Sequence, residues 1–143
     1  MSAPSDFDLR QFLPYLLNQA AEASSLNFQN IYKNRYGMLR TEWRVLFHLG
    51  IYGEMTARDI GTMAKIHKTK ISRAVQRLED RRYLVKKRDE EDRRIDRLAL
   101  TKAGITVYKD LYAIAQTYDD QLTSRLDADE IKVLRRALLK LTK

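Results

Sequence analysis

The chain has 143 residues, of which 44% are hydrophobic and 32% charged, with a formal net charge of +8 and an isoelectric point of about 9.8. These values are typical of one folded domain and exclude a disordered chain, and the basic excess favours a polyanionic partner such as nucleic acid over a merely solvated basic surface. Because cysteine is absent and histidine occurs only at His48 and His67, disulfides, thiol chemistry and a histidine-rich metal site are excluded.

The chain also lacks the features of a membrane protein or an enzyme. No apolar run approaches the roughly 20 residues of a membrane span, and the opening residues lack the apolar core of a signal peptide, so we expect a cytoplasmic protein. Asp59 and Glu79 are the nearest to a catalytic pair, but no glycine-rich phosphate loop or metal-ligand cluster accompanies them. The sequence therefore predicts no enzyme, no catalytic residue, no metal and no cofactor.

Apolar residues at spacings of three and four predict a first helix over about residues 8–35. Pro14 lies either at a kink in this helix or in its true first turn, and Gly37 breaks the chain after it. A second helix is predicted over about residues 41–49, with Gly50 after its end.

A third helix is indicated by Thr56 and Asp59, which have the spacing of a capping box. The Thr56 hydroxyl is expected to cap the backbone of the helix, and the Asp59 side chain to accept the backbone N–H of Thr56 in return. Met63 is expected to face inward from this helix. A fourth helix is predicted over about residues 68–81. Its predicted buried stripe is Ile71, Ala74, Val75 and Leu78.

The other face of the fourth helix has the residue types that bind DNA. Arginine can bind guanine and glutamine adenine, each through two hydrogen bonds, and serine, threonine and lysine bind phosphates or bases. Many surface helices are equally polar, but this one has no acid from 68 to 78, whereas a solvated face usually mixes signs. We therefore predict a DNA recognition helix. Its predicted DNA-binding residues are Lys68, Thr69, Lys70, Ser72, Arg73, Gln76 and Arg77.

A hairpin is predicted after this helix, with strands over residues 83–88 and 95–100, where apolar and other residues alternate. Asp92, in the charged connection between them, can pair with Arg93 or Arg94 and hold a guanidinium in place. A narrow minor groove attracts an inserted arginine. We predict that both arginines bind DNA and that Asp92 supports them, although the acidic connection also fits a solvated hairpin tip.

Two further helices are predicted at the end of the chain. Thr101 caps a helix over about residues 101–124, whose apolar residues form a heptad-like seam. Asp127 and Glu130 form a capping box that opens a last helix with its own apolar stripe. The apolar stripes at both ends of the chain fit either an intramolecular bundle or pairing with a second copy.

Together these stretches resemble the MarR family of winged helix-turn-helix transcription regulators over nearly the full length of the chain. The short Asp-Arg-Arg becomes specific because it lies on a wing, after the recognition helix and before Leu-Thr-x-x-Gly. The matching stretches are residues 41–46 (TEWRVL), 53–60 (GEMTARDI), 68–75 (KTKISRAV), 78–79 (LE), 92–94 (DRR) and 98–104 (LALTKAG).

The resemblance implies a mainly α fold with a small β wing, in which residues 1–143 form a single MarR-type domain. Helices at about 8–35 and 101–143 are then the dimerisation helices of a homodimer, and about 41–100 the winged helix-turn-helix lobe. The resemblance also implies sequence-specific binding to a pseudo-palindromic operator, usually as a repressor that a small effector, often a phenolic or aromatic acid, releases from double-stranded DNA.

In this family the effector pocket lies between the dimer helices and the DNA-binding lobe. An arginine among aromatic side chains suits an aromatic carboxylate, although Trp43 also fits the core and His48 a packed or capping position. The residues expected near the pocket are Tyr32, Tyr36, Trp43, Arg44 and His48.

The chain departs from the family at three points. Arg82 stands where glycine is usual, and a left-handed backbone there strains arginine by roughly 1 kcal/mol. Leu39 stands where serine or threonine often opens the second helix, so Thr41 is the candidate replacement cap. The absence of cysteine excludes the thiol-based sensing of one branch. An architectural DNA-binding protein without an effector is the alternative function.

Overall fold

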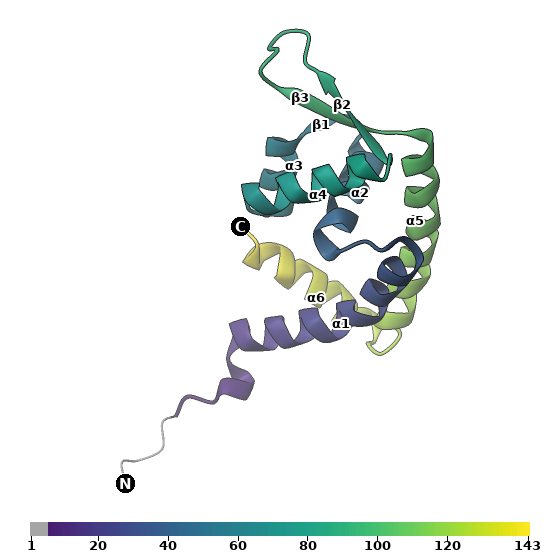
Figure 1. Ribbon diagram of the computed structural model, residues 1–143. Helices are drawn as coiled ribbons and strands as arrows, with labels where there is room; N and C mark the ends of the chain where they lie inside the picture. Colours follow the sequence, from purple (N-terminus) through teal and green to yellow (C-terminus); the bar gives the residue numbers. More distant parts are fainter. Residues whose placement is uncertain (1–5) are drawn as a thin grey trace.

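The computed structural model describes residues 6–143 and confirms a mainly α fold with a small β wing (Figure 1). A lobe of short helices carries the hairpin, and the long helices from both ends of the chain lie beside and below it. The elements in chain order are the 3-10 turn η1 (Leu9–Gln11), α1 (Leu13–Tyr36), α2 (Arg40–Tyr52), β1 (Met55–Thr56), α3 (Ala57–Ala64), α4 (Lys68–Asp80), β2 (Leu84–Arg88), β3 (Asp96–Leu100), α5 (Lys102–Thr123) and α6 (Ala128–Leu141).

The first predicted helix is divided into η1 and α1. Pro14 lies in the first turn of α1 and makes no kink, because its fixed φ and missing N–H suit a position whose amide has no helical partner. At the other end Gly37 has the left-handed φ of 64° and donates its N–H to the Lys33 carbonyl (2.8 Å), an ending that favours glycine.

The predicted end and cap of the second helix are both wrong. α2 continues through Gly50 to Tyr52 and ends at Gly53, whose φ is 81°. Gly50 makes room for a neighbour, since a Cβ there would lie 2.3 Å from the Tyr108 ring. Thr41 lies inside α2 and caps nothing, whereas the Glu42 carboxylate accepts the N–H of Leu39 (3.1 Å). Leucine has no side-chain acceptor, so only this half of a capping box exists.

The lobe packs α2, α3 and α4 over a three-stranded antiparallel sheet of order β1-β3-β2. The short β1 was not predicted, and it pairs Met55 with Leu98 of β3. Thr56 caps α3 as predicted, accepting the N–H of Asp59 (3.1 Å), but Met63 is exposed rather than inward-facing. The fully buried core of the lobe includes Leu46, Ile60, Ile71, Leu78, Leu84 and Leu98.

The long helices α1 and α5 join the lobe through aromatic side chains. Phe28 contacts Tyr32, Trp43 and Tyr118 at centroid distances of 5.3 to 5.4 Å, and Trp43 stacks on Tyr32 at 5.8 Å. The start of α1 and all of α6 lie away from this cluster, and no residue of α6 is buried within the described chain.

Candidate nucleic-acid interface

α4 presents a basic polar face and buries an apolar one. His67 precedes the helix and its Nδ1 accepts the N–H of Thr69 (3.3 Å). The predicted stripe of Ile71, Ala74, Val75 and Leu78 is buried. All the predicted DNA-binding residues of the helix are exposed, namely Lys68, Thr69, Lys70, Ser72, Arg73, Gln76 and Arg77. The amide of Gln76 donates to Asp80 (2.9 Å), and this bond leaves its second N–H and its carbonyl oxygen for a base.

The turn between α3 and α4 is fixed from both sides. Lys65 has a left-handed φ of 55° and follows the last residue of α3, and Ile66 donates its N–H to the Gly61 carbonyl (3.0 Å). The guanidinium of Arg44 in α2 donates to the carbonyl of Ala64 at the end of α3. Burial lowers the pKa of Arg44, and its donor satisfies a carbonyl that the helix end leaves free.

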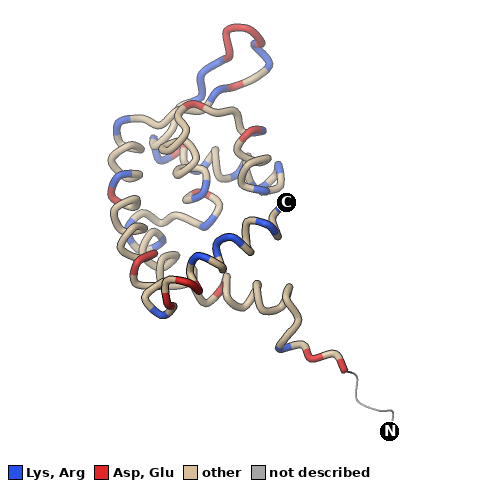
Figure 2. The backbone as a smooth tube through the Cα atoms, turned by 180° about the vertical axis from the view of Figure 1, so that it is seen from behind, with Lys and Arg blue, Asp and Glu red and all other residues tan. Residues whose placement is uncertain are grey.

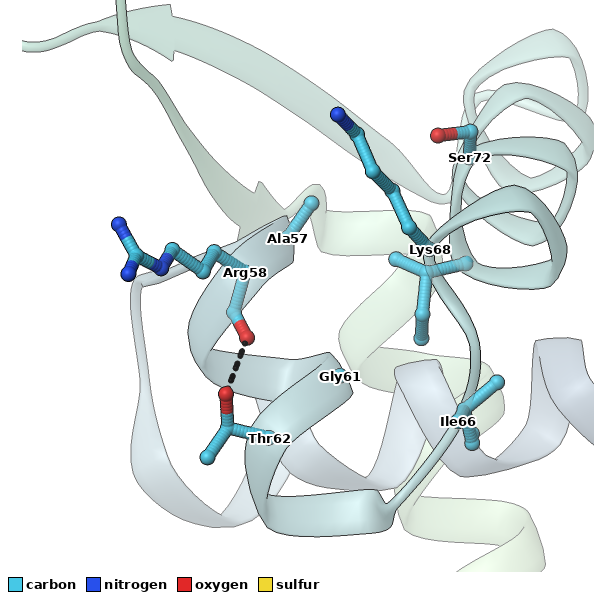
Figure 3. Close-up of a pocket in the computed structure, with 8 residues that line it drawn as sticks. Ala57, Arg58, Gly61, Thr62, Ile66, Lys68 and Ser72 are labelled. Carbon is cyan, nitrogen blue, oxygen red and sulfur yellow. Dashed lines mark hydrogen bonds between the residues drawn. The ribbon is translucent and has the colours of Figure 1, made fainter.

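A cleft of about 590 Å³ lies between α3 and the start of α4 (Figure 3). Ile66 and Ile71 contribute apolar surface, and Lys68 and Ser72 line it from α4. Arg58 and Thr62 line it from α3, and neither was predicted as a site residue. Both are exposed polar residues four positions apart, the spacing of one helix face, on the helix before the recognition helix. Their place on the helix before the predicted recognition helix is the sequence signal from which both could have been predicted.

The wing has a preformed arginine fork at its tip. Asp92 accepts from Arg94 through Nε (3.1 Å), Nη2 (3.2 Å) and the backbone N–H (3.1 Å). These bonds lower the pKa of Asp92, while the Arg94 side chain stays 91% exposed. Arg93 is used differently, because its carbonyl accepts from Arg88 (2.9 Å) and its own side chain is exposed. Of the two arginines, Asp92 therefore holds Arg94.

Lysine and arginine predominate along the sides of the hairpin and acids gather at its tip (Figure 2), apart from Asp96 at the start of β3. Glu54, next to β1, binds Lys87 of β2 (2.9 Å) and lies 3.9 Å from Arg97 of β3. The hydrogen bond from Lys87 is the main cause of the lowered pKa of Glu54. Lys86 pairs with Glu79 at the end of α4 (3.5 Å). These pairs join the base of the wing to the lobe, although exposed pairs contribute little stability.

Known proteins share both this sequence pattern and this geometry. A family model described as MarR family matches residues 36–95, from the end of α1 through the tip of the wing. The MarR family transcriptional regulator SPO1453 from Silicibacter pomeroyi DSS-3 is 26% identical, aligns over 96% of this chain and 100% of its own, and has a TM-score of 0.82. These matches support a regulator of the MarR type.

Two further proteins are similar to this chain. The HTH-type transcriptional regulator MhqR of Bacillus subtilis is 24% identical over 87% of this chain and 86% of its own. The structure of Bordetella bronchiseptica BpsR, described as explaining how 6-hydroxynicotinic acid regulates its DNA binding, aligns over 97% of this chain and 99% of its own with a TM-score of 0.88. At 19% identity that likeness shows the fold alone. The family and its relatives are transcription regulators.

The predicted effector residues of this chain line none of the main clefts among the described residues. Tyr32 and Trp43 stack inside the aromatic cluster. The Tyr36 hydroxyl donates to Asp110 of α5, Arg44 holds the Ala64 carbonyl, and His48 Nδ1 lies 2.7 Å from the Arg44 carbonyl. Tyr32 and Trp43 are therefore brought together as stacked rings, and His48 contacts the backbone of Arg44 one helical turn away.

The described residues contain no group of acids or histidines that could hold a metal ion. No helix between residues 6 and 143 is both long and apolar enough to cross a membrane.

Proposed function

We propose that this protein is a homodimeric, sequence-specific DNA-binding regulator that acts as a repressor in the cytoplasm and has no enzymatic activity. The observation that carries the proposal is the pairing of an acid-free polar face on α4 with the Asp92–Arg94 fork on the wing. In this proposal α4 enters the major groove and reads base edges. Arg94 enters the adjacent minor groove, where a narrow groove attracts a guanidinium.

The start of α3 extends this surface toward the DNA backbone. Arg58 and Thr62 lie across the cleft from Lys68 and Ser72 (Figure 3). In helix-turn-helix proteins the helix before the recognition helix crosses the phosphate backbone. We therefore assign a phosphate to Arg58 rather than a base.

Exposed apolar side chains support a second copy as the partner of the terminal helices. Leu13 and Leu16 of α1 are 58% and 39% exposed, and Leu134 and Leu138 of α6 are 45% and 37% exposed. Large apolar side chains exposed at helical spacing favour an interaction surface, and a twofold dimer matches the symmetry of a palindromic operator. The terminal segments 8–35 and 101–143 are accordingly the dimerisation helices, and 41–100 the DNA-binding lobe, of one domain.

A small aromatic acid is the effector class that the aromatic cluster favours. The indole N–H of Trp43 is buried without a hydrogen-bond acceptor among the described residues, which costs free energy until an acceptor arrives. An aromatic acid bound beside Tyr32 would supply its carboxylate as the acceptor. Because Trp43 is the single tryptophan of the chain, its fluorescence reports this binding directly. Titration with hydroxybenzoates should change the emission and weaken DNA binding together.

Selection of bound duplexes from a random DNA pool tests the proposal. We expect enrichment of an inverted repeat whose half-sites lie about one helical turn apart, roughly 10 base pairs. Recovery of many unrelated sequences with equal affinity would contradict it and support an architectural DNA-binding protein without an effector.

A further inference from the structure

Arg81 joins the end of the recognition helix to the end of α1. It is the first residue after α4, and its guanidinium reaches back across the fold. Nη1 donates to the carbonyl of Tyr36 and Nη2 to the carbonyl of Gly37 (2.8 Å). One planar fork thus holds two consecutive carbonyls at the end of a helix that is 45 residues earlier in the sequence.

The chemistry of this junction is specific to an arginine and a glycine. The end of α1 carries partial negative charge on its unpaired carbonyls, so a cation there is favourable. Two donors in a fixed plane define an orientation that a single ammonium does not. Gly37 allows the approach, because a Cβ at this position would lie 3.2 Å from Nη2 of Arg81.

The same residue of α1 also binds α5. The Tyr36 hydroxyl donates to the Asp110 carboxylate, and Arg35 pairs with that carboxylate (3.0 Å). Tyr36 therefore contacts the recognition helix through its carbonyl and α5 through its hydroxyl. Arg82, which follows Arg81, has a left-handed φ of 64° and turns the chain into the wing. The junction therefore lies where α4 ends and the wing begins, against the end of α1.

We propose that Arg81 is a positioning residue that fixes the angle of the recognition helix against α1 and α5, and thereby sets which spacing of operator half-sites the dimer accepts. The inference rests on the proposed function. One inserted base pair shifts a half-site by about 3.4 Å along the DNA axis, and turns it about the axis as well. A lobe held by the Arg81 fork cannot follow this movement, whereas a lobe without the fork can pivot at the connection between α1 and α2, residues 37–39.

The test measures affinity for the selected inverted repeat and for versions with one base pair inserted or removed between the half-sites. Wild-type protein should lose at least about tenfold on the altered spacings, comparable to the cost of one mismatched base pair. Arg81→Ala should lose most of that preference while keeping its preference for half-site sequence over random DNA.

Two further variants keep the inference testable if Arg81→Ala does not fold. Arg81→Lys retains the charge without the fork, and Tyr36→Phe retains the carbonyl without the bond to Asp110. Each should relax the spacing preference partially. Wild-type spacing profiles in these variants, or an equal loss of affinity on every spacing in Arg81→Ala, would overturn the role of Arg81. A wild-type protein indifferent to spacing would instead overturn the dimeric reader itself.

Discussion

Asp92 places an acid on a surface that we propose binds DNA, so its effect on affinity has two opposing terms. Removing a negative charge reduces repulsion from phosphate, but it also releases the three bonds that orient Arg94. Orientation before binding reduces the ordering cost. We expect the second term to be larger, because Arg94 is otherwise 91% exposed and unrestrained.

Asp92→Ala should therefore weaken operator binding, and Arg94→Ala should weaken it by about tenfold or more. Neither change should alter thermal stability or oligomeric state. Affinities measured at two salt concentrations check this, with Glu90→Ala as a control that removes an exposed tip acid. Tighter binding by Asp92→Ala would mean that the acid is only a solvated tip residue.

Tyr36 gives the Asp110 junction a pH dependence. Burial, together with the hydrogen bond to Asp110, raises the pKa of Tyr36 to about 12. An unfolded tyrosine ionises near pH 10, so the stability contributed by Tyr36 is complete below about pH 10 and is lost as the pH rises toward about 12. The same hydrogen bond lowers the pKa of Asp110, so on the acid side the contribution is lost as the pH falls through that lowered pKa.

Tyr36→Phe should lower the free energy of unfolding at pH 8 by about 1 kcal/mol, the net value of one hydrogen bond. The deficit should shrink between about pH 10 and 12 as wild-type protein loses the contribution. Urea unfolding at several pH values measures it, with Tyr52→Phe at a 58% exposed tyrosine as the control. A deficit that is constant across this range would contradict the assignment.

Single-residue roles were the least predictable from sequence. Arg44 was predicted near an effector pocket, and its bond to the end of α3 was not predicted, because the spatial partner of a long side chain is set by the fold and not by its neighbours in sequence. Arg82 takes the left-handed backbone of the glycine it replaces. Its carbonyl accepts from Thr101 (2.6 Å), and this contact from a distant residue helps to hold the strained turn.

Most of the helices were predictable as elements because their apolar spacing and caps are local properties of the sequence. Thr56, Thr101 and Asp127 accept the expected backbone N–H groups. The errors have tertiary causes. Gly50 was predicted to follow the end of the second helix, but it lies inside α2 and leaves space for the Tyr108 ring. β1 has only two residues, too few to show an alternating pattern in the sequence, and it is defined by its pairing with β3.

The recognition helix as an element leads to a prediction about Arg73. It is exposed on α4 and, within the described residues, forms no ion pair with a carboxylate. Arg73→Ala should cost roughly 1–3 kcal/mol of operator affinity and narrow the gap between operator and random DNA if the side chain reads a base. Competition binding with both DNAs measures this. An equal loss on both would reassign Arg73 to a phosphate.

At the scale of the whole molecule, α1 and α6 lie below the lobe (Figure 1) and keep apolar side chains exposed, and we propose that a second copy covers these side chains. Sequence periodicity located these stripes but left an intramolecular bundle and a second copy equally open. In the described structure α6 remains unburied against its own chain, so an intramolecular bundle does not cover it. The proposed dimer covers both faces and presents two α4 helices and two wings to one duplex.

The mass of the complex with the selected inverted repeat tests this dimeric reader most directly. Native mass spectrometry should find two chains of 16.8 kDa on one duplex, and two chains in the free protein at micromolar concentration. A duplex with one half-site scrambled should bind far more weakly. A monomeric free protein, or one chain per duplex with no loss on the scrambled half-site, would contradict the account.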